Sequence, residues 1–121
     1  MIGYATIGTN DLARAGPFYD AIAKELGATR TMESDRYIGW GSQGTAALLA
    51  IKPFDGSNAT PGNGSMPALA AKERVQVDRV HAVALSLGGK DEGAPGLRGG
   101  TFYAAYFRDP DGNKLAVFVS G

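Results

Sequence analysis

Cysteine is absent from this chain of 121 residues, and histidine and tryptophan each occur only once. Without cysteine the protein has no disulfide, no thiolate nucleophile and no thiolate metal site. A zinc site, or an iron site with two histidines and one carboxylate, needs several converging His, Cys or carboxylate donors. A single histidine cannot supply the histidine ligands of either site. A site made only of carboxylates needs several that converge, and the predicted strands do not provide them.

Net charge is also absent, because twelve basic and twelve acidic side chains cancel. No basic run is interleaved with aromatic residues, so neither nucleic acid nor an anionic membrane is an expected partner. No apolar run approaches the ~20 residues that cross a bilayer. The opening residues MIGYATIG lack the basic and apolar regions of a signal peptide. We therefore expect a cytoplasmic location.

The first half of the chain alternates like a strand over residues 2–8 and then becomes helical. Apolar residues recur every three or four positions, which predicts one buried helix face; they are Leu12, Ala15, Tyr19, Ile22 and Leu26. Asn10 or Thr9 is the expected N-cap, and Pro17 predicts a kink or a late start. Short strands are predicted over 29–33, 37–41 and 45–52.

The second half repeats this order after a loop over residues 53–65 that is rich in Pro, Gly, Ser and Asn. A strand is predicted over 66–71, a helix over 73–87 and a weak strand within the glycine-rich stretch 88–100. The last two strands, 101–108 and 113–119, are joined by the turn Asp109-Pro110-Asp111-Gly112, whose glycine suits a positive φ. Each half therefore reads as a strand, a helix and three strands, which gives an α+β fold.

Three stretches in this order resemble the vicinal oxygen chelate superfamily, which includes glyoxalase I, bleomycin-resistance proteins, fosfomycin-resistance enzymes and extradiol dioxygenases. They are TIGTNDLARAGPFYDAI, GNGSMPALAAKERVQVDRVHAVAL and GGKDEGAPGLRGGTFYAAYFRDPDGNKLAVF. The resemblance implies one domain of two βαβββ modules that form a half-open, cup-like mixed sheet with helices on its outer face. Module 1 would span about 1–52, the linker 53–65 and module 2 about 66–121.

The resemblance implies a divalent metal site. In such proteins the metal is bound by a His on the first strand, a His on the fifth strand and a Glu on the last strand. The corresponding positions here are Tyr4, Met66 and Ala116. Alanine has no donor atom, a thioether suits Cu(I), and neutral tyrosine is a poor ligand. The single histidine, His81, lies within a predicted helix between apolar neighbours and is interpreted as a packing residue. We therefore expect no metal and no cofactor.

Alternation along the strands predicts which other side chains share the cup with these three positions. Candidate ligand-binding residues are Tyr4, Thr6, Trp40, Met66, Ala68, Tyr103, Ala116 and Phe118. Trp40 is included because a large aromatic side chain beside glycines suits a flat ligand. Tyr103 and Tyr106 fall on opposite faces of their strand, so at most one of them faces the cup. These side chains would equally well fill a core.

Three hypotheses for function remain. The first is a metal-free protein that binds a small apolar or aromatic molecule in the cup, as bleomycin-resistance proteins sequester a drug. The second is a metal-dependent lyase or dioxygenase with a non-standard site using Glu33, Tyr4 and a buried carbonyl, although a metal enzyme of the usual family type is disfavoured. The third is a degenerate scaffold that binds a partner. Family members of this size often form dimers, so a homodimer is expected.

Overall fold

The computed structural model describes residues 1–121 and contains the predicted pair of βαβββ modules. The first module consists of β1 (Tyr4–Gly8), α1 (Leu12–Glu25), β2 (Thr29–Glu33), β3 (Tyr37–Gly41) and β4 (Ala47–Ile51). The second consists of β5 (Ala68–Ala70), α2 (Arg74–Ser86), β6 (Lys90–Leu97), β7 (Phe102–Arg108) and β8 (Lys114–Ser120). The α+β fold predicted from the sequence is confirmed.

Each module builds its own four-stranded mixed sheet with the same connectivity. Sheet A has the strand order β1-β4-β3-β2, and sheet B has the order β5-β8-β7-β6. In both sheets the first strand of the module pairs in parallel with the last, and the other pairs are antiparallel. No strand pair joins the two sheets, so β1 and β5 each have one unpaired edge.

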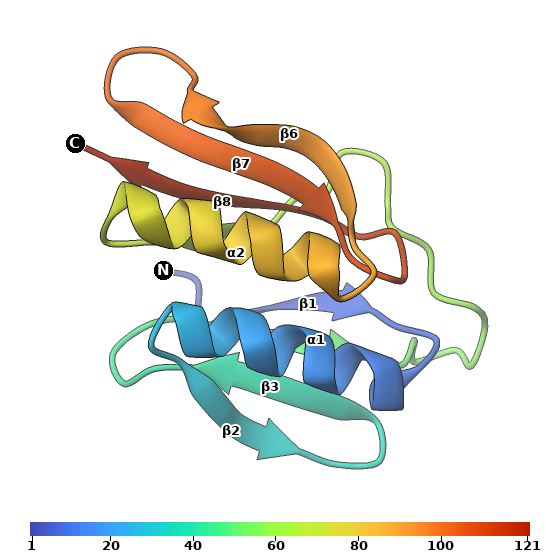
Figure 1. The fold of residues 1–121 in the computed structure, drawn as a ribbon. Coiled ribbons are helices and arrows are strands. Elements are labelled where there is room, and N and C mark those ends of the chain that lie inside the picture. The colour runs from blue at the N-terminus through green and yellow to red at the C-terminus, as the bar shows by residue number, and fades with distance from the viewer.

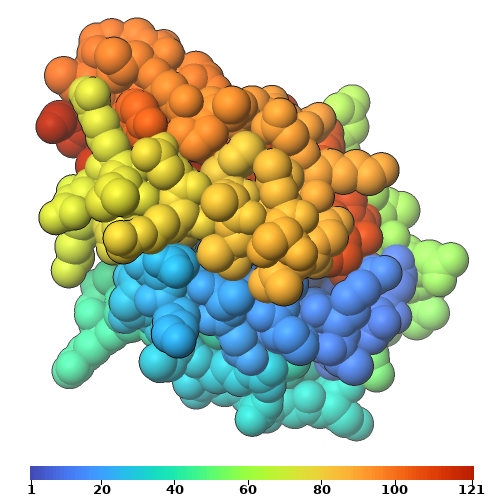
Figure 2. All heavy atoms as spheres, viewed as in Figure 1, coloured from blue at the N-terminus to red at the C-terminus, as the bar shows by residue number.

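The two helices lie side by side where the modules meet, and each covers one face of its own sheet (Figure 1). In the space-filling view, α1 in blue and α2 in yellow form much of one side of the molecule (Figure 2). One apolar core lies under both helices; its largest fully buried members are Phe18, Val77, Val80, Phe107, Leu115 and Val117. Neither α1 nor α2 has the length and apolar content that a membrane-spanning helix requires.

The N-cap of α1 differs from the prediction. Asp11 caps the helix, because its carboxylate accepts a hydrogen bond from the backbone N–H of Arg14 at 3.1 Å. The helix starts at Leu12, so Pro17 does not delay it. The side chains of the predicted caps bind elsewhere: the Thr9 hydroxyl donates to Asp111 at 2.6 Å, and the Asn10 amide group bonds to the backbone of Ala59 in the linker. The sequence could not show this competition, because the competing partners lie 102 and 49 residues further along the chain.

The predicted turn at Asp109–Gly112 forms, with Gly112 at φ +91°, and it also joins the modules. The carboxylate of Asp109 is buried and accepts hydrogen bonds from the Tyr19 hydroxyl of α1 at 2.5 Å and from the Asn113 amide at 2.9 Å. Burial, reinforced by the Asp109 charge, raises the pKa of Tyr19 well above its usual value. A side-chain network in a tight turn thus fixes the second module against the first.

Candidate functional site

The side of each sheet that faces away from its helix is called here its open face. On β8, Leu115 and Val117 belong to the core beneath α2, so the alternate residues Lys114, Ala116 and Phe118 lie on the open face of sheet B. Strand pairing adds further side chains to this face; they are Ala68, Ala70, Phe102, Ala104, Tyr106 and Arg108.

Four of the predicted ligand-binding residues come together on the open face of sheet B. Ala68 pairs with Ala116 across the parallel β5–β8 ladder, and Met66 precedes them at the entrance of β5. Phe118 follows two residues later and stacks on Phe102 with 5.5 Å between ring centroids. This part of the face is apolar and aromatic, as predicted.

Tyr4 and Thr6 lie on the open face of the other sheet. Both are exposed, and Ile7 between Thr6 and Gly8 points into the core, so the predicted alternation of β1 is present. Tyr4 pairs with Ala47 and Thr6 with Leu49. Tyr4 and Thr6 therefore belong to sheet A, whereas Ala116 belongs to sheet B, and no strand pair connects the two sheets.

Trp40 does not lie on an open face, and this part of the prediction is wrong. It alternates with glycine on β3 such that Ile38 and Trp40 point toward α1, and only 4% of Trp40 is exposed. Its indole N–H donates to Asp20 at 2.8 Å, and its ring lies 5.2 Å from that of Tyr19. Trp40 therefore packs into the core, and the other face of β3 carries Gly39 and Gly41 on either side of it.

Tyr103 is likewise on the helix side, where its hydroxyl donates to Asp78 of α2 at 2.6 Å. That hydrogen bond raises the pKa of Tyr103. Tyr106 takes the open-face position instead, directly opposite Ala116. The sequence held the information for this choice: the turn closes with Asp109 opposite Asn113, and counting back along both strands places residue 106 opposite residue 116.

A polar hollow borders the open face of sheet B where the linker enters β5. Its volume is about 520 Å³, and its lining residues are Pro61, Gly62, Asn63, Gly64, Ser65, Met66, Arg108 and Lys114. The sequence predicts this segment only as a linker. The signal that could have found the hollow is the cluster of polar and glycine residues directly before a predicted cup residue, Met66.

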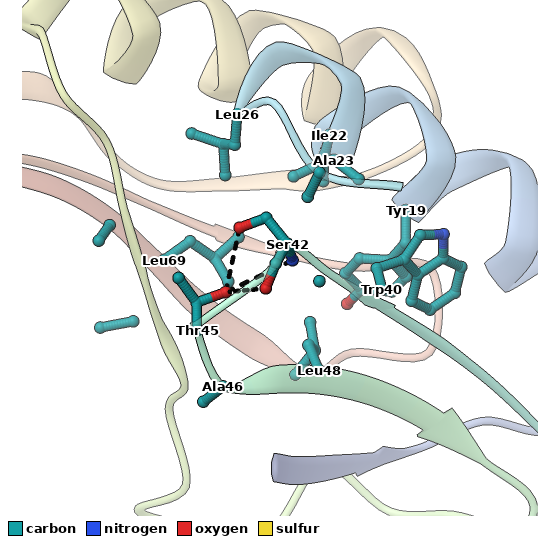
Figure 3. Close-up of a pocket in the computed structure, with 14 residues that line it drawn as sticks. Tyr19, Ile22, Ala23, Leu26, Trp40, Ser42, Thr45, Ala46, Leu48 and Leu69 are labelled. Carbon is teal, nitrogen blue, oxygen red and sulfur yellow. Dashed lines mark hydrogen bonds between the residues drawn. The ribbon is translucent and has the colours of Figure 1, made fainter. Parts of the chain in front are cut away.

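A second, apolar hollow of about 320 Å³ lies on the helix side, between α1, the β3–β4 hairpin and β5. Figure 3 shows Ile22 and Leu26 of α1 above it, with Leu48 on the opposite side. The hydroxyls of Ser42 and Thr45 lie 3.1 Å apart and bond to each other. Trp40 borders this hollow on the helix side and not the open face on which it was predicted.

Comparison with known proteins agrees with this geometry. The family model "Glyoxalase/Bleomycin resistance protein/Dioxygenase superfamily" matches residues 1–117. The chain belongs to this superfamily. A search of curated protein sequences gave no match.

Solved structures of the superfamily superpose over the whole chain. A glyoxalase/bleomycin resistance protein from Albidiferax ferrireducens has a TM-score of 0.93 and 34% identity, over 100% of this chain and 99% of its own. A superfamily enzyme from Burkholderia phytofirmans has a TM-score of 0.78 and 19% identity, covering 98% of each chain. A lactoylglutathione lyase from Agrobacterium tumefaciens has a TM-score of 0.71 and 21% identity, over 98% of this chain and 92% of its own. The last two show the fold alone.

The metal that some superfamily members bind does not fit the residues present here. Ala116 has no donor atom, and its neighbours on the open face are Ala68 and Tyr106. Nowhere in the chain do three His, Cys, Asp or Glu side chains gather in a way that could hold a metal ion. His81 is buried in α2 and bonds to Asp91 at 2.9 Å, away from the open face.

Proposed function

We propose that this superfamily member binds a small apolar or aromatic molecule on the open face of sheet B, without a metal. The observation that carries the proposal is the composition of that face. Ala68, Ala116 and Phe118 form a smooth apolar strip where the superfamily's metal centre would need donor atoms. Stacked aromatic rings flanked by a few polar groups are typical of small-molecule sites.

The exposure of two residues argues against the alternative that side chains fill the cup. Tyr4 is 64% exposed and Met66 is 41% exposed, so neither is packed into a core. Side chains that replaced a lost metal as filler would instead be buried among their neighbours. The parts of the open faces around Tyr4 and Met66 are therefore available for a ligand or for another protein surface, whereas Ala116 is only 2% exposed.

The same exposure supports a homodimer. The open faces of both sheets carry apolar side chains that one chain leaves uncovered, including Tyr4, Met32 and Met66. Contiguous exposed apolar surface marks a site of interaction in soluble proteins. A second copy that places its own sheet against these residues would close a half-open face into a pocket.

The enzyme alternative required Glu33 and Tyr4 to share a site. Glu33 pairs with Ile38, whose side chain points into the core, and its carboxylate is bound to Arg30 at 2.8 Å. Tyr4 lies on the opposite face of the same sheet. The two residues thus point away from each other, and this observation disfavours a metal-dependent lyase or dioxygenase that uses them.

Metal content and ligand binding test the proposal together. Plasma mass spectrometry on untagged protein is expected to find far less than one divalent ion per chain, and a chelator is expected to leave the melting temperature unchanged. One tightly bound ion per chain, with a lower melting temperature after chelation, would contradict the proposal.

A thermal-shift screen of aromatic compounds would then find ligands, and the single tryptophan reports where they bind. Trp40 lies on the helix side, so a ligand on the open face should leave its fluorescence unchanged. A ligand that strongly quenches Trp40 would instead occupy the apolar hollow beside α1.

A further inference from the structure

We propose that the ligand of the open face is an anion, an aromatic or apolar molecule whose carboxylate, sulfonate or similar oxyanion enters the polar hollow beside sheet B. This inference rests on the proposed function and specifies the chemical class of the ligand. Two observations carry it: cations without an acidic partner stand at one end of the face, and the apolar strip begins directly beside them.

The first cation is Lys114, on β8 two residues before Ala116. It is half-buried, and no carboxylate lies within ion-pair distance of it in the chain. Its ammonium lies 5.7 Å from the centre of the Tyr106 ring. A cation–π contact positions a charge without neutralising it. Lys114 therefore presents an uncompensated positive charge to the hollow that it lines.

Two arginines extend this positive region. Arg98 stands over the same Tyr106 ring, with its guanidinium carbon 5.4 Å from the ring centre, and has no acidic partner. Arg108 lines the hollow; its Nε binds Glu92 at 3.0 Å and its Nη1 binds the Gly112 carbonyl at 3.0 Å. Of the acidic residues nearby, Glu92 pairs with Arg108, Asp111 of the adjoining turn pairs with Arg14, and Asp109 is buried among neutral donors. Lys114 and Arg98 are therefore left without an ion-pair partner at this end of the sheet.

The opposite wall of the hollow provides hydrogen-bond donors. It is the linker segment 61–66, which includes the Asn63 amide and the Ser65 hydroxyl. Neither side chain has a partner within the protein. Neutral donors facing lysine and arginine make an environment suited to an oxyanion, since bonds to a charged acceptor are the stronger kind.

The apolar part of the ligand would extend along the same face. Met66 lines the hollow and leads into the strip formed by Ala68, Ala116 and Phe118. The strand residues on the open face of sheet A carry no formal charge, so the second sheet offers no competing cation. The anionic group thus has one place to bind, at the Lys114 end.

The test compares two fluorescent probes that share an aromatic body. One is 8-anilinonaphthalene-1-sulfonate, an anion, and the other is N-phenyl-1-naphthylamine, which is uncharged. Full-length protein should bind the sulfonate more tightly, and Lys114→Gln should weaken the sulfonate about tenfold while leaving the uncharged probe unchanged. Higher salt should weaken only the sulfonate. Lys72→Gln removes an exposed lysine outside the hollow and serves as the control for net charge.

The outcomes separate this inference from the proposed function. If both probes bind equally well, or if Lys114→Gln and Lys72→Gln weaken the sulfonate by the same factor, the inference is wrong while the binding site on the open face stands. If neither probe binds, both proposals fail. Circular dichroism and melting temperature would establish that each variant is folded, which is expected because the ammonium of Lys114 bonds to no protein acceptor.

Discussion

Replacing Asp109 by asparagine should destabilise the protein by about 3 kcal/mol, although the two side chains have the same shape. The buried carboxylate accepts four hydrogen bonds, from the backbone N–H groups of Asp111 and Asn113 and from the side chains of Tyr19 and Asn113. An asparagine oxygen can keep the two backbone bonds. Its NH₂ group would then face the NH₂ group of Asn113, and one buried donor would lose its acceptor.

The magnitude follows from these two losses. A buried donor without a partner costs about 1–3 kcal/mol, and bonds to a neutral oxygen are weaker than bonds to a carboxylate by about 1 kcal/mol. Tyr19→Phe removes only the hydroxyl and leaves three of the four bonds, so it should cost about 1.5–3 kcal/mol. Because the two side chains bond directly, the double variant should be more stable than the sum of the single variants predicts.

Urea unfolding followed by Trp40 fluorescence measures these values, since Trp40 packs against Tyr19. The pH dependence gives an independent check. Burial raises the pKa of Tyr19 in the folded protein, so its contribution to stability is complete below the unfolded value of about 10 and is lost at higher pH. The stability advantage of the native protein over Tyr19→Phe should therefore shrink above pH ~10. Costs below about 0.5 kcal/mol for Asp109→Asn, or strict additivity with Tyr19→Phe, would refute the idea that this turn holds the modules together.

Three further predictions concern other parts of the molecule. The Arg30 guanidinium, with the Trp40 indole, holds the pKa of Asp20 below its ordinary value. Lowering the pH below ~4 should therefore reduce the stability of the native protein by more than it reduces the stability of the Asp20→Asn variant. Equal losses in the two proteins would show that the ion pair contributes nothing. Gly89→Ala would place a Cβ atom 2.7 Å from the carbonyl oxygens of Ala84 and Arg108 and should cost about 1–3 kcal/mol in thermal unfolding, whereas Gly3→Ala meets no atom within 4 Å and should be neutral. Light scattering should give the mass of two chains for the native protein and of one chain for Tyr4→Glu; a native monomer would remove the homodimer from the proposal.

Much of the fold could be predicted because its determinants are local. Apolar residues at helical spacing identified α1 and α2, and the strands 29–33 and 37–41 were predicted with the bounds that the structure shows. The glycine-rich stretch predicts only a weak strand where the structure has β6. The pairing of β6 with β7 shifts register around Gly93, so no regular alternation appears in the sequence.

The candidate site was predicted in part. Alternation placed Ala68, Ala116 and Phe118 on one face because parallel and antiparallel pairing both preserve the side of the sheet. Trp40 was misplaced, since an aromatic residue between glycines suits either face and only the position of α1 decides which face is buried. Tyr103 was chosen over Tyr106 although the hairpin register favours Tyr106.

The sequence by itself determined the two-module α+β fold and the family, because periodicity, turn glycines and motif order act over short distances. It also determined that position 116 offers no metal donor, because alanine has no donor atom in any conformation. Only the tertiary structure decided that Asp111 binds Thr9 across the modules and that Lys114 stands over Tyr106 without an acidic partner. Those contacts join residues from separate strands, helices and turns, and their distances are set by how the sheets and helices pack.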